Sequence, residues 1–493
     1  MDLEASIFYL LLPLILLPLL WKMQISKGRL RLPPGPTKLP IIGNLHQLRG
    51  LPHRALAKVA KQHGPLSYVR FGSVPAVVVS SADMAKEVIK THDLAFAGRP
   101  CGLASRKLSY GCLDMVFSPY GDYWRHLRKV CAQELLSVTR VQSFRSIRAR
   151  EVSHMIHSIR QAAPLGPINI SHVLLSLTNS IICTAAFGSK YGGSRDENSK
   201  FQGILGESNE VIIGFSVADF FPWLEWISRV TGLEEKLDKV FRKLDCFFEM
   251  VIEEHLDPAR PKPEQEDFID VMLRVQKDAS RGISLTRQHI KAVIMDMFLA
   301  GTDTTFATLL WSMTELIRHP RIMMKAQEEV RKIVGEKKSV EEEDVQQLDY
   351  LETNNKGGSQ ATPSVPRECT ESCSVNGYDV PIKTRLFVNV WAIMRDPEFW
   401  EDPEEFRPER FAGTDFDFTG QNFQYVPFGS GRRRCPGNSF GTANAELALA
   451  SLLHCFDWEL PEGMRKEDVN MDEALGLALH KKVALHLVAT SRF

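Results

Sequence analysis

The sequence lacks the charge excess and the internal divisions that mark several classes of protein. Its 60 lysines and arginines equal its 60 aspartates and glutamates, so the formal net charge is zero. Nucleic-acid-binding proteins usually carry a basic excess, so this balance argues against that class. Length alone would suggest about three domains. However, no Gly/Ser or acidic linker and no internal repeat divides the 493 residues, which is consistent with one large domain.

Cysteine is also scarce. The nine cysteines are scattered and odd in number, and no two of them form a Cys-x-x-Cys pair. Small secreted proteins that depend on disulfides have dense, regularly spaced cysteines. The pattern therefore predicts a reducing compartment and no disulfide framework.

The N-terminus carries the longest uncharged apolar run. From Ala5 to Trp21 it would form a helix about 25 Å long, which is enough for a thin endoplasmic-reticulum bilayer. Pro13 and Pro18 interrupt the run, but membrane helices tolerate proline. A cleaved signal peptide is the rival interpretation, and the lack of a small-x-small cleavage site argues against it.

The charges around this run predict its orientation. Acidic residues precede it, whereas Lys22, Lys27, Arg29 and Arg31 follow it, so the positive-inside rule keeps the C-terminal side in the cytosol. We expect a transmembrane signal anchor over residues 1–22. A basic and Pro-rich joint follows over 23–40, and a cytosolic domain over 41–493.

Helical periodicity dominates that domain. Apolar residues recur at three and four positions in 137–160, 234–256 and 285–318. Strand-like patterns are short and lie in 65–81 and 376–390. The predicted fold class is mainly α with small β-sheets.

One cysteine has unusual neighbours. Cys435 lies in FGSGRRRCPG (428–437), and an apolar helix pattern follows at once. Nearby cations and a helix N-terminus lower the pKa of a thiol and favour the thiolate that binds metal. We therefore expect Cys435 to be a metal ligand. Zinc is disfavoured because no second cysteine or histidine lies at ligand spacing.

The surroundings of Cys435 suit a flat cofactor. Glycines let the backbone approach a bulky flat group closely, and arginines can hold carboxylates. A flat, doubly carboxylated group that binds thiolate is haem. The alternative is an ordinary surface loop with an incidental cysteine. The residues concerned are Gly429, Gly431, Gly437, Arg432, Arg433 and Arg434.

A polar hexapeptide, AGTDTT (300–305), interrupts an apolar helical stretch. Gly301 in a helix interior costs about 1 kcal/mol against alanine, and Asp303 is costly if it is buried without a partner. Thr304 and Thr305 can bond back to carbonyls and bend the helix. Together they indicate room beside the helix, a hydroxyl and a proton source. The alternative is a polar notch that faces solvent.

The Cys435 stretch resembles the haem-binding signature of cytochromes P-450, F-x-x-G-x-R-x-C-x-G. It matches at Phe428, Gly431, Arg433, Cys435 and Gly437. The resemblance spans essentially the whole chain and looks closest to the plant microsomal branch. It implies the cytochrome P-450 fold, a helix-rich triangular prism, with heme b bound and Cys435 as the axial thiolate ligand of the iron.

The resemblance also implies roles for other residues. Thr304 would hydrogen-bond iron-bound dioxygen, Asp303 would help to relay protons, and Ala300 and Gly301 would leave space above the ring. By themselves, Trp124 and Arg128 indicate only a cation–π or surface pair. In the family they would be haem-propionate ligands. Arg367 and Arg433 occupy positions that the family uses similarly.

The implied function is that of a haem-dependent monooxygenase acting on a small lipophilic metabolite. No dinucleotide-binding Gly-rich turn follows a strand, so electrons must come from a partner. The resemblance implies the membrane-bound NADPH–cytochrome P-450 reductase. A basic patch of Arg125, Lys129, Arg432 and Arg434 could dock it, or could simply be a solvated face. A haem-thiolate isomerase or lyase is the alternative enzyme, which AGTDTT argues against.

The family pattern breaks at residues 352–365. ETNNKGGSQATPSV replaces the expected Glu-x-x-Arg helix, and its composition is that of a loop. Arg410, the structural arginine of FRPERF (406–411), would lose its carboxylate partner. Loss of one partner of a buried pair costs about 3–5 kcal/mol. A misjoined coding segment and a non-functional product are therefore a second alternative.

Three further segments match regions that line the substrate pocket in relatives. They are residues 102–117, 215–226 and 475–479. The FFPW sequence in the second is apolar enough to face the membrane instead. The sequence does not choose among terpenoid, phenolic and alkaloid substrates.

Overall fold

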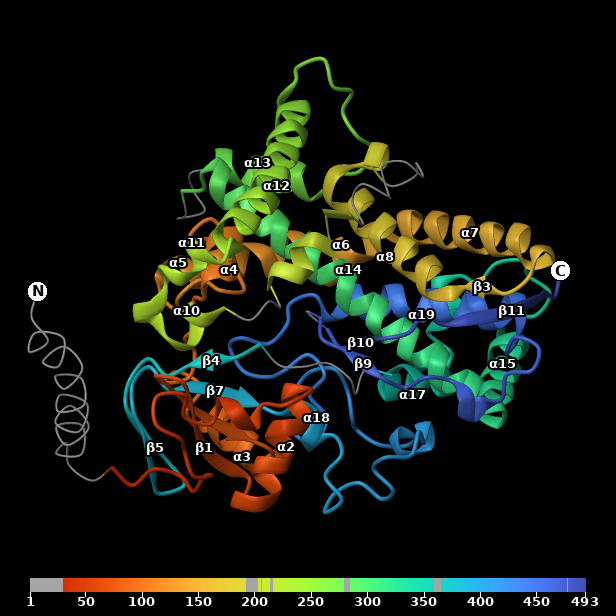
Figure 1. Ribbon diagram of the computed structural model, residues 1–493. Helices are drawn as coiled ribbons and strands as arrows, with labels where there is room; N and C mark the ends of the chain where they lie inside the picture. The colour runs from red at the N-terminus through yellow and green to blue at the C-terminus, as the bar shows by residue number, and fades with distance from the viewer. Residues whose placement is uncertain are drawn as a thin grey trace, which may run out of the picture.

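A 32-residue helix, α14 (Arg287–Arg318), runs through the helical part of the molecule. It begins with a capping box formed by Thr286 and His289, and most of its side chains are buried on every side. Three helices pack along it: α8 (Ile170–Phe187), α17 (Asp349–Gly358) and α19 (Asn438–Cys455). Figure 1, from the computed structural model, shows α14 between α8 and α19.

The structure describes residues 30–191, 203, 204, 206–212, 216–278, 284–358, 365–476 and 478–493. The expected membrane anchor at 1–22 lies outside these residues. Two of the described helices, α8 and α14, are long and apolar enough to cross a membrane. Their most apolar windows are 72% and 78% buried inside the protein, as expected for core helices.

The remaining helices surround this core or cover the sheet. They are α2 (Pro52–His63), α3 (Ala82–Lys86), α4 (Leu103–Leu108), α5 (Asp122–Val130), α6 (Val138–Ser143), α7 (Arg145–Ala162), α10 (Val217–Phe220), α11 (Ile227–Val230), α12 (Leu233–Leu256), α13 (Phe268–Lys277), α15 (Pro320–Val334), α16 (Glu342–Val345) and α18 (Val390–Ile393). The helices predicted over 137–160, 234–256 and 285–318 are confirmed as α6 with α7, α12 and α14.

The largest sheet has four strands in the order β1-β2-β7-β4. β1 (Leu66–Phe71) and β2 (Val74–Val79) form the predicted hairpin, which turns at Gly72 with a φ of +60°. β7 (Arg385–Val388) pairs with β2 in parallel, and β4 (Arg367–Glu368) pairs antiparallel with β7. In Figure 1 this sheet lies below the helices with α2, α3 and α18 around it.

Three smaller sheets complete the fold. The order β3-β11-β8 joins β3 (Ile168–Asn169), β11 (His486–Ser491) and β8 (Phe456–Glu459). β5 (Cys373–Val375) pairs with β6 (Tyr378–Val380), and β9 (Glu473–Ala474) pairs with β10 (His480–Lys481). The fold class predicted from the sequence, mainly α with small β-sheets, is confirmed.

The prediction of a loop from residue 352 is wrong for its first half. Residues up to Gly358 are helical in α17, which packs on α14 and buries Leu351, Asn354 and Asn355. Local propensity is a weak determinant, and burial against neighbouring helices overrides it. The rest of the predicted loop, 359–364, lies outside the described residues.

The expectation that the cysteines form no disulfide is also wrong in one place. Cys101 and Cys112 are joined, and the other seven cysteines form no disulfide. The two residues lie at opposite ends of α4, and the chain reverses after that helix. Their pairing follows from this reversal, which the spacing of the cysteines does not reveal.

Candidate cofactor pocket and active site

The Cys435 loop depends on glycine at two turns. Gly429 and Gly431 both have a φ of +68°, a conformation that favours glycine. A Cβ at Gly431 would lie 2.6 Å from Asp93 Oδ1, so the loop packs too closely there for any side chain. The Cys435 amide donates to the Phe428 carbonyl oxygen at 2.9 Å, and α19 begins three residues later.

The Cys435 side chain is accessible although protein atoms surround it. It is exposed, yet burial raises the pKa of the thiol above its ordinary value. A ligand can therefore reach the sulfur within a largely desolvated environment. Arg128 and Arg434 act in the opposite direction and lower the pKa, but burial dominates. The predicted net lowering of the pKa of this thiol is therefore wrong.

The middle of α14 opens on one face only. Ala300, Gly301, Thr304 and Thr308 are partly exposed, although most residues between 290 and 314 are buried. Spacings of one, four and eight residues place them on the same side of a helix. Thr304 Oγ1 donates to the Ala300 carbonyl oxygen at 2.7 Å, as the sequence predicts. These four residues are therefore the accessible side of an otherwise buried helix.

Gly301 has a packing role that the sequence did not predict. A Cβ at this position would lie 2.8 Å from Ile182 Cδ1 on α8. The missing side chain therefore lets α8 pack against α14 beside the open face. Ala300 and Thr304, together with Gly301, would border the space that the sequence predicts above the cofactor.

Asp303 is buried, with 2% of its surface exposed, and it has three hydrogen-bond partners. Asn209 Nδ2 and His480 Nε2 both lie 2.9 Å from Asp303 Oδ1, and the Ala478 amide donates to Oδ2 at 2.9 Å. These contacts offset the cost of burying the carboxylate. Sequence reasoning missed Asn209 and His480 because they are distant in the chain.

Arg433 lies in a cluster of buried cations. Its Nε donates to the Ala97 carbonyl oxygen at 2.8 Å, and Nη2 donates to the Ser118 carbonyl oxygen at 2.7 Å. The guanidinium lies over the Trp124 ring, 4.1 Å from the centroid. Burial and the nearby Arg367 lower the pKa of Arg433 to about 9.

Arg99 belongs to the same cluster, and sequence reasoning missed it. Its Nη1 donates to the carbonyl oxygens of Val365 and Pro366 at 2.6 and 2.7 Å. Burial, Arg367 and Arg433 lower the pKa of Arg99 well below its ordinary value. No motif spacing marks this residue. The only signal is an arginine directly after the apolar run LAFAG.

The cluster has more cations than nearby carboxylates. Arg367 pairs with Asp93 at 2.9 Å, and Arg432 shares the same carboxylate at 3.0 Å. Arg99 and Arg433 form hydrogen bonds only to carbonyl oxygens within the described residues. Burial and the neighbouring cations lower the pKa of both arginines and outweigh the buried Asp114, which raises it. Buried cations in excess of nearby carboxylates favour an anionic ligand.

Trp124 and Arg128 lie beside the cluster on α5. The Trp124 indole donates to the Met115 carbonyl oxygen at 2.9 Å, and Arg128 donates to the Arg434 carbonyl oxygen. The structure thus brings Trp124, Arg128, Arg367 and Arg433 to one place, next to the Cys435 loop. These residues fit a flat dicarboxylate such as haem, with the thiol at its centre and the cations at its edge.

Arg410 has no carboxylate partner among the described residues, as the sequence predicts. It donates to the carbonyl oxygens of Arg407, Asp402 and Glu405, and its Nη1 is buried without a hydrogen bond. On α17, Lys356 Nζ instead lies 2.9 Å from Glu352 Oε1. The buried polar groups in this part of the core are therefore only partly hydrogen-bonded.

Comparisons with known proteins agree with this geometry. Residues 33–488 match the family described as Cytochrome P450. Cytochrome P450 71AP13 of Prunus mume is 48% identical over 99% of this chain and 96% of its own length. Strychnine-11-hydroxylase of Strychnos nux-vomica is 47% identical over 93% and 91%. Premnaspirodiene oxygenase of Hyoscyamus muticus is 45% identical over 99% and 97%.

A solved structure shows the same fold. A zebrafish cytochrome P450 with progesterone superposes with a TM-score of 0.76 at 24% identity. The match covers 90% of this chain and 100% of the zebrafish chain. The fold predicted from the Cys435 signature is therefore confirmed.

Proposed function

The chain belongs to the cytochrome P450 family, and we propose that it oxidises a small lipophilic metabolite between Cys435 and the open face of α14. It is a haem-dependent monooxygenase that uses dioxygen and electrons from a redox partner. The single observation that carries the location is the accessible Cys435 thiol beside a cluster of buried arginines.

In this proposal the haem is held at its centre and at its edge. Cys435 would bind the iron as thiolate, and Phe428, Gly431 and Gly437 would shape the loop that presents it. Arg433, Arg367, Arg99, Trp124 and Arg128 would hold the two propionates. When bound, haem supplies the iron that activates dioxygen, and thiolate ligation favours O–O bond cleavage.

Thr304 and Asp303 would handle protons. The Thr304 hydroxyl lies on the open face and can exchange its bond to the Ala300 carbonyl for a bond to a ligand. Asp303 lies next to it in the helix but is held by His480 and Asn209 on the far side. We assign Asp303 Oδ1 and His480 Nε2 to the resupply of protons toward Thr304.

The electrons would come from NADPH–cytochrome P-450 reductase. Arg125, Lys129 and Arg432 are exposed near the Cys435 loop, although Arg125 and Arg432 also pair with Asp122 and Asp93. A basic surface of this kind suits an acidic flavoprotein and would raise the rate of association.

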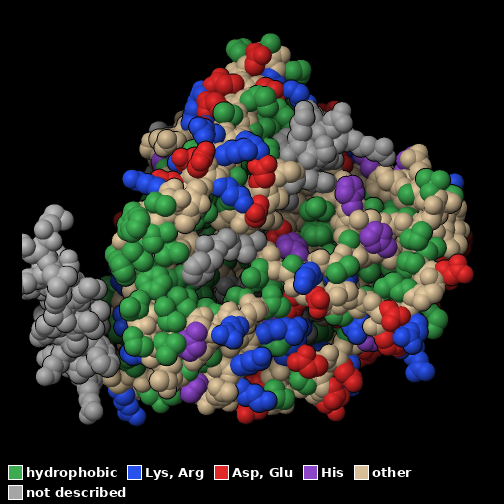
Figure 2. All heavy atoms as spheres, viewed as in Figure 1, with side chains coloured by type: hydrophobic (Ala, Val, Ile, Leu, Met, Phe, Trp, Pro, Cys, Tyr) green, Lys and Arg blue, Asp and Glu red, His purple; other side chains and the backbone are tan. Residues whose placement is uncertain are grey.

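We place the protein on the endoplasmic-reticulum membrane, with residues 1–22 as a single span and the catalytic domain in the cytosol. Hydrophobic side chains gather on the side of the molecule where α10 lies (Figure 2). Trp223 and Trp226, which follow α10 in the chain, are 65% and 59% exposed. Exposed aromatic residues of this kind suit a membrane interface.

The names of relatives narrow the substrate class. Two of them are a strychnine hydroxylase and a premnaspirodiene oxygenase. We therefore propose an alkaloid or terpenoid substrate. Residues 102–117, 215–226 and 475–479 would contribute to its recognition. Phe215 and Leu477 lie outside the described residues.

The reduced, carbon-monoxide-bound absorption spectrum of the purified protein tests the proposal. A thiolate-type red shift in the native protein, absent in Cys435→Ser, is expected. Lack of any haem band would favour the non-functional product, since Arg410 has no carboxylate partner in the part of the chain that the structure describes. If the haem is present, turnover that requires no NADPH or reductase would instead favour an isomerase or lyase.

A further inference from the structure

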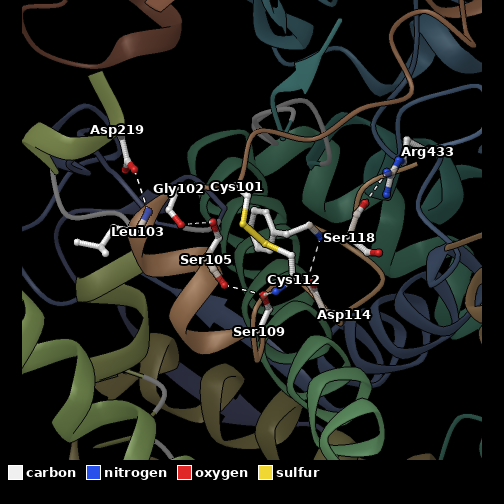
Figure 3. Close-up of a disulfide and its surroundings, with 11 residues drawn as sticks. Cys101, Gly102, Leu103, Ser105, Ser109, Cys112, Asp114, Ser118, Asp219 and Arg433 are labelled. Carbon is white, nitrogen blue, oxygen red and sulfur yellow. Dashed lines mark hydrogen bonds between the residues drawn. A yellow bond between two sulfur atoms is a disulfide. The ribbon is translucent and has the colours of Figure 1, made fainter. Parts of the chain in front are cut away.

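The disulfide between Cys101 and Cys112 closes a loop around α4 (Figure 3). Cys101 lies two residues before this helix and Cys112 lies four residues after it. Neither sulfur takes part in the proposed oxidation, although Cys112 lies in the segment 102–117 that we propose for substrate recognition. A disulfide is also unexpected in a cytosolic domain, where thiols are kept reduced unless they are transient or sense redox state.

The base of this loop is anchored without the disulfide. Arg99 Nε donates to the Val116 carbonyl oxygen at 3.1 Å, which joins the two ends of the loop directly. Asp296 Oδ2 on α14 accepts from the Met115 amide at 2.7 Å. Reduction of the disulfide would therefore leave the arginine cluster in place and free only the segment 102–111.

That segment is held in a strained conformation. Tyr110 and Cys112 have φ values of +55° and +65°, which are unfavourable for residues other than glycine, and Gly111 lies between them at +80°. Such backbone persists only where its surroundings enforce it. The disulfide fixes one end of this turn, so its loss lets Cys112 relax toward an ordinary conformation.

α4 is also held by apolar packing, because Leu108 is 3% exposed in the main core and Leu103 packs against that core. Its polar contacts lie nearer the surface. Leu103 N donates to Asp219 Oδ1 of α10 at 2.9 Å (Figure 3), and Lys107 pairs with Asp238 at the surface. Tyr110 donates to Asp245 at 2.9 Å. Exposed pairs of this kind contribute little to stability. The disulfide is thus a covalent restraint on this segment in addition to its packing, and reduction removes it while the core contact of Leu108 remains.

This segment also forms one wall of a cleft. A cavity of about 270 Å³ lies between α4 and α12. Leu103, Arg106, Lys107 and Gly111 line it on the α4 side, and Glu225, Leu237, Asp238 and Phe241 line it opposite. A shift of α4 changes the width of this α4–α12 cleft.

We propose that Cys101 and Cys112 form a reversible redox site that sets the position of α4 and the width of the α4–α12 cleft. The chemistry needs only a dithiol as the reductant. Cys101 is exposed whereas Cys112 is 5% exposed, so attack falls on the sulfur of Cys101.

The exchange balances without any other reactant. A thiolate of the dithiol attacks Cys101 Sγ, the S–S bond breaks, and Cys112 Sγ leaves as a thiolate and takes up a proton. The second thiol of the reductant then displaces Cys101, which also ends as a thiol, and the dithiol becomes a disulfide. Two electrons and two protons pass to the protein, and an oxidised dithiol reverses the reaction.

The experiment uses the full-length protein in membranes with dithiothreitol and oxidised glutathione as probes. Differential alkylation followed by peptide mass mapping measures the redox state of each cysteine. We expect Cys101 and Cys112 to be protected after oxidation and alkylated after reduction. Cys369 and Cys373, whose sulfurs lie 4.0 Å apart, are mapped separately. Alkylation of Cys101 and Cys112 that oxidation does not prevent overturns the proposal.

Amide hydrogen exchange measures the effect on α4. Reduction should raise the exchange rate over 102–111 about tenfold, while β1 stays unchanged. Cys101→Ser/Cys112→Ser should exchange at the reduced rate under both conditions, whereas Cys246→Ser, at an exposed free cysteine, should respond as the native protein does. An unchanged rate over 102–111 in the native protein overturns the proposal without any variant.

A third measurement connects the site with the proposed function, on which this last consequence rests. Residues 102–111 belong to the segment 102–117 that the proposed function assigns to substrate recognition. Association of phenylimidazole with the haem should therefore be several-fold faster after reduction, at equal haem content. If the protein holds no haem, the proposed function fails, but alkylation and hydrogen exchange still decide the redox site. Equal association rates in haem-loaded protein would overturn the control of the cleft.

Discussion

His480 Nε2 lies 2.9 Å from Asp303 Oδ1, and this contact joins β10 to the middle of α14. The imidazole also stacks on Phe306, with ring centroids 5.5 Å apart and planes inclined by 28°. Its Nδ1 is buried without a hydrogen-bond partner among the described residues. These contacts fix the orientation of the His480 ring relative to Asp303. A proton that passes from His480 to Asp303 thus reaches the residue next to Thr304.

Asp303→Asn and His480→Gln should each slow NADPH-dependent turnover by about tenfold or more, within the range of general acid–base catalysis. Each change keeps the size and a hydrogen bond but removes a titratable group. If the two act in one relay, the double variant should be no slower than the slower single variant. The carbon-monoxide spectrum should stay unchanged, and additive losses would argue against a shared relay.

Thr304→Ala should uncouple electron use from oxidation. The hydroxyl is removed from the open face of α14, while the helix hydrogen bonds remain. Peroxide released per NADPH should rise several-fold, and product should fall in proportion. Thr308→Ala, one turn further along the same face, serves as the matched control. Equal peroxide yields in the two variants would contradict a special role for Thr304.

Local patterns were enough for most of the helical framework. The three-and-four periodicity over 285–318 corresponds to α14, and the alternation over 65–81 corresponds to the β1–β2 hairpin. Both signals arise within one element, because each face of a helix or strand is buried or exposed as a unit. The Cys435 loop was recognisable for a similar reason, since its chemistry is contiguous in sequence.

Contacts between distant segments were not predictable in the same way. Asp303 and His480 are 177 positions apart, and Arg99 meets Arg433 only through the fold. The pKa of the Cys435 thiol shows a second limit of prediction from the sequence. The sequence reveals the cations near Cys435 but not its burial, which outweighs them. Tertiary packing likewise made α17 helical despite Asn-Asn and Gly-Gly.

Glu446 on α19 should make stability depend on pH. Burial and the neighbouring Glu352 raise the pKa of this carboxyl to about 7, against the smaller opposing effects of Asn355 and Lys356. The folded protein therefore keeps a proton that the unfolded chain loses near pH 4.5. The stabilisation is complete below that pH and is lost as the pH rises through about 7, at a cost of about 2–3 kcal/mol.

Glu446→Gln removes this titration, because the amide is neutral at every pH. Urea unfolding followed by tryptophan fluorescence should show the variant about 2 kcal/mol more stable than the native protein at pH 8. The difference should nearly vanish at pH 4.5. Glu336→Gln is the matched control, since that side chain is 92% exposed. If the stability difference between the native protein and Glu446→Gln were the same at pH 8 and at pH 4.5, this result would contradict the raised pKa of Glu446.

Gly358, the last residue of α17, should tolerate no side chain. A Cβ there would overlap Ser312 Oγ and lie 3.3 Å from the Ser312 amide nitrogen on α14. Gly358→Ala should therefore lower the free energy of unfolding by about 1–3 kcal/mol. Gly206→Ala, in a helical segment with open space around the glycine, should change it by less than about 0.5 kcal/mol. Equal unfolding midpoints would mean that α17 does not pack on α14, because only this close approach distinguishes the two glycines.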